Sequence, residues 1–187
     1  MPKDLFAPGI YDPKRSEVIP TVTKPERWKS VIHQHKAFKA GPHFDLRLLE
    51  PGTDNLHSWA LRKLPKPGEK ALAVLQPTHS ADYIGFKGVI PKGYGAGSVG
   101  IHSKKSVKVI KAEPGKISFE RGKELFTLVK TKPKGKRDKD WLLINRTKQA
   151  SAGGGGGIGS SGGIVALLFT NLLRGTKLSK IVKGKKG

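Results

Sequence analysis

The sequence contains no cysteine. Disulfide bonds and cysteine-ligated zinc sites are therefore excluded, and any metal ion must be held by histidine, aspartate or glutamate. Acidic residues are also scarce, because 14 Asp and Glu stand against 36 Lys and Arg, giving a formal charge of +22. A polyanion compensates such an excess, so we expect nucleic acid as the partner. The alternatives are a basic surface without a ligand and a structural protein of the ribosomal kind.

Long apolar stretches are missing as well. The N-terminal residues lack the apolar core and cleavage site of a secretory signal, which predicts a cytoplasmic location. The apolar run at 164–173 is shorter than the roughly 20 residues that a membrane span needs. Because only basic charges follow this run, we predict a short C-terminal helix that docks onto a partner or an anionic membrane.

The 187 residues suffice for one well-buried domain with tails. Recurrent prolines predict an extended arm over residues 1–27, and a Gly/Ser-rich stretch predicts a flexible linker over 150–163. These boundaries leave a central domain at 28–149 and an apolar-then-basic tail at 164–187.

Short runs of apolar, β-branched and aromatic residues, separated by Gly and Pro, predict β-strands in the central domain. No window shows a sustained helical period. The predicted fold class is therefore mainly β, an antiparallel β-barrel with short flanking helices or arms. The Arg121-Gly122-Lys123 segment predicts a hairpin turn. The strand-forming runs are residues 44–48, 71–75, 107–110, 125–129 and 141–144.

Large aromatic residues are more typical of a small barrel's core than of base-stacking surfaces. We therefore assign Trp59, Phe126 and Trp141 to the core. His57 and His102 show no pattern that indicates chemistry, and we assign them to the surface.

Residues 130–139 combine basic side chains with a proline and a glycine, which predicts a basic loop between two strands. Such a loop can follow nucleic-acid phosphates, although a solvated turn without a ligand is the alternative. The side chains assigned here to nucleic-acid binding are Lys130, Lys132, Lys134, Lys136 and Arg137.

The pattern His-x-Asp-x-Arg at residues 43–47 places three polar side chains on one face of a strand. A turn at Gly41-Pro42 would return His35 to the side of His43. Two imidazoles and the carboxylate of Asp45 form a three-ligand site with open positions, suited to manganese or zinc. The guanidinium of Arg47 suits a phosphate on that ion. An ion-paired surface row without a metal is the alternative.

A further string, Phe-Lys-Gly-Val-Ile-Pro-Lys-Gly-Tyr-Gly-Ala-Gly at residues 86–97, is too specific to be explained by packing alone. Together with segments 58–60, 77–83 and 141–144, it resembles the 3′-phosphoesterase domain of bacterial DNA ligase D over about residues 31–146. The resemblance implies a β-barrel enzyme that removes 3′-terminal ribonucleotides and 3′-phosphates from DNA and leaves a 3′-hydroxyl for polymerases and ligases.

The resemblance also implies the roles of individual residues. Manganese, with zinc or another divalent metal as the alternative, would be held by the three-ligand set His35, His43 and Asp45. The scissile phosphate would be bound by Arg47 and His79 and positioned by Tyr83. The implied partners are DNA 3′ ends in a duplex or primer-template, and a DNA ligase or polymerase acting in trans, because the chain lacks the Lys-x-Asp-Gly motif of nucleotidyl transfer.

The chain departs from the family pattern at several positions. Seven residues separate His35 from His43 where the family usually has five, and Pro77 stands where an acidic residue is usual. His33 replaces a usual glutamine, and no glutamine lies between Gly93 and Tyr94. A catalytically weak or inactive DNA-end-binding module is therefore the alternative function, and a structural basic protein that keeps the barrel as a scaffold is a third.

Overall fold

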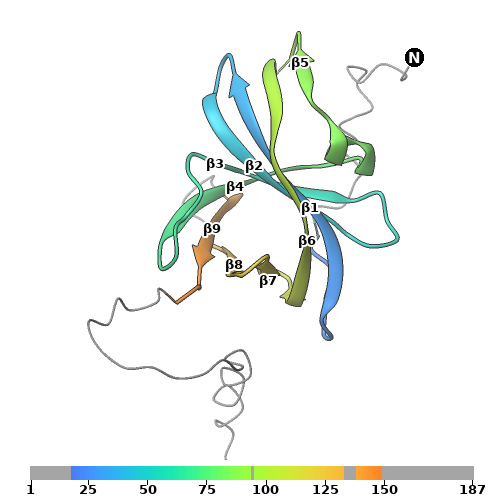
Figure 1. Cartoon of the computed structure of the whole chain (residues 1–187), viewed down its shortest axis with the longest axis vertical. Helices are drawn as coiled ribbons and strands as arrows, with labels where there is room; N and C mark the ends of the chain where they lie inside the picture. Colours follow the sequence, from blue (N-terminus) through green and yellow to red (C-terminus); the bar gives the residue numbers. More distant parts are fainter. Residues whose placement is uncertain (1–17, 94, 133–137, 149–187) are drawn as a thin grey trace, which may run out of the picture. The chain divides into compact units, whose positions relative to one another are not determined.

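The computed structural model describes residues 18–93, 95–132 and 138–148, and most of them form one antiparallel sheet (Figure 1). A short 3₁₀ helix, η2 (Ala81–Gly85), precedes β5. The five predicted strand-forming runs all lie inside strands, which confirms them. The strands are β1 (Glu26–Ala37), β2 (Gly41–Leu49), β3 (Leu56–Leu61), β4 (Lys70–His79), β5 (Gly88–Ile90), β6 (Gly97–Glu113), β7 (Lys116–Arg121), β8 (Glu124–Lys130) and β9 (Asp140–Asn145).

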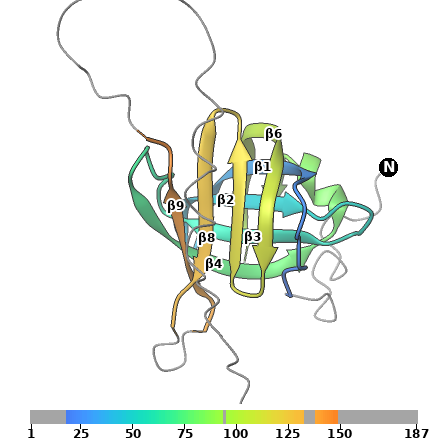
Figure 2. The same cartoon turned by 90° about the horizontal axis from the view of Figure 1, so that it is seen from below.

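The sheet closes on itself. Its strand order is β1-β2-β3-β4-β9-β8-β7-β6, and β1 also pairs with β6, so that eight strands form a ring (Figure 2). The short β5 pairs with the beginning of β6. Closure leaves few unpaired strand edges, and it confirms the predicted mainly β, barrel-like fold. Within the described ranges, no helical segment has the length and apolar character that a membrane crossing requires.

The predicted tails are only partly described. Ile19 and Val22, from the predicted arm, are buried in the core, and Val22 pairs with Ala112 of β6. Strand β1 begins at Glu26, two residues before the predicted domain boundary. The linker at 150–163 and the C-terminal helix and basic tail within 164–187 lie outside the described residues, so these assignments stay predictions.

The interior of the ring holds the main hydrophobic core. Leu46 and Leu48 of β2 point into it, as strand alternation predicts. Trp59 and Trp141 are 0% and 2% exposed and meet edge to face with ring centroids 5.7 Å apart. Phe126 is also buried. The assignment of these aromatic residues to the core is confirmed.

The outer face of β1, β2 and β3 is covered as well. A second apolar cluster, formed by Leu56, Tyr83, Phe86 and Val99, joins this face to η2 and the segment before β5. Residues 45–48 of β2 are therefore buried on both faces, the inner one by the core and the outer one beneath η2. The polar side chains on its outer face lie in a largely dehydrated space.

Residues 95–97 lie tightly against β1. A Cβ atom placed on Gly97 would come within 2.2 Å of the carbonyl oxygen of Lys36, and the φ angle of Gly97 is +146°. Only glycine fits this position, so the end of the Gly-rich string is fixed against the strand that carries His35.

Two smaller predictions have opposite outcomes. The hairpin turn is confirmed, because residues 122–123 join β7 to β8 and Gly122 has a φ of 68°. The surface assignment of His57 is wrong. His57 faces inward from β3, is 0% exposed and stacks on Trp28 with ring centroids 6.2 Å apart, and its pKa is lowered by burial. His102 is exposed as predicted.

Candidate active site

Three candidate metal ligands meet on one hairpin. His35 of β1 pairs directly with His43 of β2, which confirms that the two imidazoles are neighbours, although the turn lies at residues 38–40 rather than at Gly41-Pro42. Asp45 Oδ2 is 3.6 Å from His35 Nδ1, and Asp45 Oδ1 is 3.6 Å from His43 Nε2. One ligand atom from each residue lies within 4.8 Å of the others.

The hydrogen bonds of the imidazoles orient this set for a metal ion. His35 Nε2 is 3.0 Å from the carbonyl oxygen of Gly95, and His43 Nδ1 is 2.8 Å from that of Gly41. A carbonyl can only accept, so each of these nitrogens carries the proton and the other nitrogen presents its lone pair toward Asp45. This is the usual arrangement of metal-bound histidines. The three residues therefore fit a divalent cation with further positions open.

Arg47 lies next to the ligand set and is 4% exposed. Its Nη2 donates to Asp45 Oδ2 at 3.2 Å, and its Nε donates to His33 Nδ1 at 3.1 Å. Its Nη1 donates to Ser58 Oγ at 2.7 Å and to His79 Nδ1 at 3.0 Å. Four of the five N–H donors of the guanidinium are thus used by protein groups, and the geometry of the side chain is fixed.

The structure brings the other two predicted residues to the same place. The ring of Tyr83, from η2, lies 4.7 Å below the guanidinium carbon of Arg47 and 5.0 Å from the ring of His79. Because the guanidinium can only donate, His79 Nδ1 accepts and its Nε2 carries the proton. The site therefore combines a three-ligand set with a guanidinium, an imidazole N–H and a phenol.

The Asp45 carboxylate remains ionised. Burial opposes the ionisation of Asp45, but the Arg47 guanidinium and the two neighbouring imidazoles lower the pKa of Asp45 to about 2. The carboxylate is therefore charged at any physiological pH, as metal ligation requires.

The imidazoles around Arg47 are neutral at pH 7. Burial, reinforced by the positive charge of Arg47, lowers the pKa of His33 to about 4 and that of His79 to about 3. Burial raises the pKa of Tyr83, which keeps its hydroxyl protonated. His79 and Tyr83 therefore offer the site uncharged hydrogen-bond donors.

The buried state of His33 predicts a loss of stability in acid. The unfolded chain protonates this residue near pH 6.5, whereas the folded chain does so only near pH 4. The unfolded state therefore gains protons first, and stability falls between these two pH values, by about 3 kcal/mol for His33. Above pH 6.5 this residue contributes no pH dependence.

The measurement is urea unfolding from pH 7.5 to 4 in the presence of a chelator. We expect His33→Gln to reduce the slope of stability against pH below 6.5, whereas the control His102→Gln, an exposed histidine, leaves it unchanged. Equal slopes in wild type and His33→Gln would contradict the assignment.

Besides His33, which accepts from Arg47, two contributors to the site were not assigned from the sequence. Ser58 lies opposite Arg47 in the β2–β3 register, and the carbonyl of Gly95 accepts from His35. Ser58 belongs to one of the segments that carry the family resemblance, but its role becomes visible only once β3 is paired with β2.

The described basic residues Lys130 and Lys132 are not part of this cluster. Lys130 ends β8 and Lys132 follows it, both exposed, and β8 is separated from β2 by three strands in one direction around the ring and from β1 by two in the other. Lys134, Lys136 and Arg137 lie outside the described residues. Their assignment to nucleic-acid binding stays a prediction.

The comparison with protein families agrees with this geometry. Residues 33–144 match the family model described as the DNA Ligase D 3′-phosphoesterase domain. The matched range is more than half of the chain and includes every residue of the candidate site. No curated protein matches the chain.

Proposed function

The chain belongs to the DNA ligase D 3′-phosphoesterase domain family, and from this premise we propose that it is a metal-dependent enzyme that processes DNA 3′ ends. It removes 3′-terminal ribonucleotides and 3′-phosphates and leaves a 3′-hydroxyl for DNA repair. The observation that carries the proposal is the convergence of His35, His43 and Asp45 with Arg47 and His79 on one buried sheet face.

In this proposal the three-ligand set holds manganese, and zinc or another divalent ion is the alternative that the mixed nitrogen and oxygen ligands permit. A bound ion would neutralise phosphate charge and lower the pKa of a coordinated water. The protein positions its own groups around the same phosphate. The Nη2 atom of Arg47 has one N–H without a partner among the described residues, and this N–H can donate to a phosphate oxygen.

The uncharged donors of His79 and Tyr83 act on the same phosphate. The Nε2–H of His79 and the hydroxyl of Tyr83 stabilise negative charge that develops on the phosphate oxygens in the transition state. For both substrates water is the attacking nucleophile. Its attack on the terminal phosphodiester expels the 5′-oxygen of the ribonucleoside and leaves a 3′-phosphate, and its attack on a 3′-phosphate releases inorganic phosphate and leaves the 3′-hydroxyl.

The proposed partners follow from the product and the charge. DNA 3′ ends in a duplex or primer-template are the substrate, and the excess of basic residues supplies the long-range attraction. The liberated 3′-hydroxyl serves a polymerase or a ligase in trans. We retain the proposals that the basic loop at 130–139 contacts DNA and that the tail at 164–187 docks onto a partner or an anionic membrane.

Metal removal tests the activity. End-labelled primer-templates that end in one ribonucleotide or in a 3′-phosphate are incubated with chelator-treated protein, with and without added manganese. We expect release of the terminal group only with the metal, and we expect His43→Ala to remove this activity because one ligand is lost.

His102→Ala is the matched control, because it changes an exposed histidine outside the cluster, and it should retain full activity. If the wild-type protein binds the DNA ends tightly but releases nothing with manganese, zinc or magnesium, the proposal is wrong and the chain is a DNA-end-binding module.

A further inference from the structure

An exposed aromatic side chain lies beside the candidate site. Five large apolar side chains of the described residues are markedly exposed, and Phe38, at 75%, is the most exposed of them and the only aromatic one. Phe38 lies in the turn between β1 and β2, three residues after His35 and five before His43. The turn that joins the metal ligands therefore presents a phenyl ring to solvent.

The backbone of this turn is held in place. The N–H of Phe38 donates to the carbonyl oxygen of Ala96 at 2.9 Å. Its neighbour Ala37 pairs with both Gly41 and Gly97, and Gly97 packs against β1 without room for a side chain. The ring of Phe38 is thus carried on a rigid support, which reduces the entropy lost when a ligand stacks on it.

The same segment links the turn to the metal ligands. Gly95 accepts a hydrogen bond from His35, and Ala96, the next residue, accepts from Phe38. At about 3.3 Å per residue along a strand, Phe38 lies roughly 10 Å from His35. This spacing is within the reach of one nucleotide, so a phosphate at the metal site can belong to a nucleotide whose base contacts the ring.

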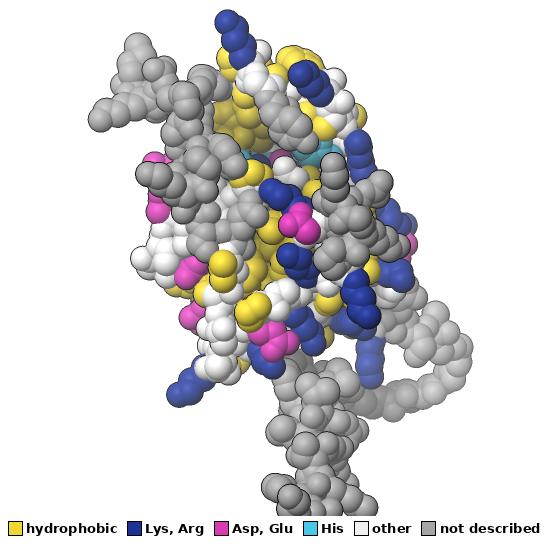
Figure 3. Space-filling model, turned by 180° about the vertical axis from the view of Figure 1, so that it is seen from behind, with side chains coloured by type: hydrophobic (Ala, Val, Ile, Leu, Met, Phe, Trp, Pro, Cys, Tyr) yellow, Lys and Arg dark blue, Asp and Glu magenta, His cyan; other side chains and the backbone are white. Residues whose placement is uncertain are grey.

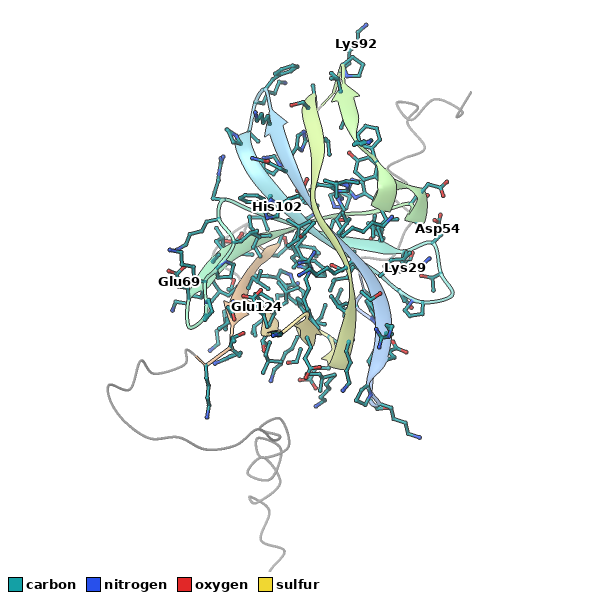
Figure 4. The ribbon with its side chains drawn as sticks, viewed as in Figure 1. Lys29, Asp54, Glu69, Lys92, His102 and Glu124 are labelled. Atoms are coloured by element: carbon teal, nitrogen blue, oxygen red, sulfur yellow. The ribbon has the colours of Figure 1, made fainter. Side chains whose placement is uncertain are left out.

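Positive charge surrounds the ring. Lys36 and Lys39 flank Phe38 and are exposed, and Lys92, just beyond β5, points away from the sheet at the same end of the molecule as the β1–β2 turn (Figure 4). These lysines form no ion pair with a described acidic residue. At that end, dark blue side chains stand beside exposed apolar surface (Figure 3).

An aromatic ring flanked by cations, next to a phosphate site, is the combination with which proteins bind unpaired nucleotides. We propose that Phe38 is a stacking subsite for the nucleobase at the 3′ terminus of the DNA, an inference that rests on the proposed function. Every base has an aromatic face, so the subsite accepts all four. Stacking holds the terminal nucleotide away from the duplex and places its sugar and phosphate at the metal ligands.

The test separates base stacking from general DNA affinity. Binding is measured with a chelator present, so that no cleavage occurs, on two primer-templates that differ only in whether the 3′-terminal nucleotide carries a base or is abasic. We expect Phe38→Ala to weaken binding of the first by roughly 5- to 150-fold, the range of aromatic stacking, and to leave binding of the abasic end unchanged. Leu72→Ala, which truncates an exposed apolar side chain of β4, is the matched control and should have no effect.

A second variant reports the contact directly. Phe38→Trp should restore binding, and the fluorescence of the new indole should be quenched by the DNA with a terminal base but not by the abasic one. Equal losses on both DNAs, or self-association that Phe38→Ala abolishes, would overturn the subsite. Base-dependent binding without manganese-dependent release would instead contradict the proposed enzyme activity and support the subsite. Manganese-dependent release at the same rate in wild type and Phe38→Ala would support the enzyme activity and overturn the subsite.

Discussion

Replacing Asp45 with asparagine is expected to abolish tight manganese binding and to lower the rate of 3′-end processing by roughly 10³-fold or more. Asp45 supplies the single carboxylate of the ligand cluster found in the described residues, and each of its oxygens faces one imidazole. Asparagine keeps the size of the side chain but removes the charge that a divalent ion requires.

Calorimetric titration with manganese and the end-labelled assay measure the two effects. Asp82→Asn is the matched control, because Asp82 is an exposed acid on η2 and its loss should alter neither. Thermal unfolding shows whether Asp45→Asn remains folded without the partner of Arg47. A folded Asp45→Asn protein with wild-type metal affinity and rate would show that the cluster is structural.

Replacing Arg47 with lysine should be nearly as damaging, although the charge is kept. An ammonium has three donors on one atom and cannot reach Asp45, His33, Ser58 and His79 from the positions of a planar guanidinium. Buried polar groups then lose their partners, and we expect a loss of about 3 kcal/mol in stability. The rate should fall roughly 10²- to 10³-fold, because the donor to the phosphate is lost as well.

Urea unfolding and single-turnover kinetics on stable protein check these values. Arg62→Lys is the control, since Arg62 is exposed and its side chain donates to the Pro42 carbonyl alone among the described residues. We expect manganese affinity to change far less in Arg47→Lys than in Asp45→Asn. Full activity in Arg47→Lys would exclude the guanidinium as a phosphate ligand.

Much of the arrangement of the candidate metal ligands could be predicted from the sequence, because these three residues lie close together along the chain. Strand alternation fixes which side of β2 carries His43 and Asp45, and a short turn returns the chain to His35. The predicted turn was displaced toward residues 38–40, which did not alter the pairing.

The remainder depends on which distant strands become neighbours. Ser58 meets Arg47 only through the β2–β3 register, and His57 is buried because β3 turns that residue toward the core. Strand β3 was not among the strand-forming runs, so neither contact could be derived. The covering of the outer sheet face by η2 likewise has no signal in strand periodicity, and the low exposure of Arg47 follows from that covering.

The order of folding depends on whether the residues in contact lie close together or far apart along the chain. All three candidate metal ligands lie within one hairpin, residues 35–45, which closes a short loop and can form early. Arg47 acquires His79, and His35 acquires the Gly95 carbonyl, only when segments 32 and 60 residues away along the chain have docked. The candidate metal ligands can therefore come together on a chain that is still folding, whereas the full set of contacts around Arg47 forms only after the ring has closed.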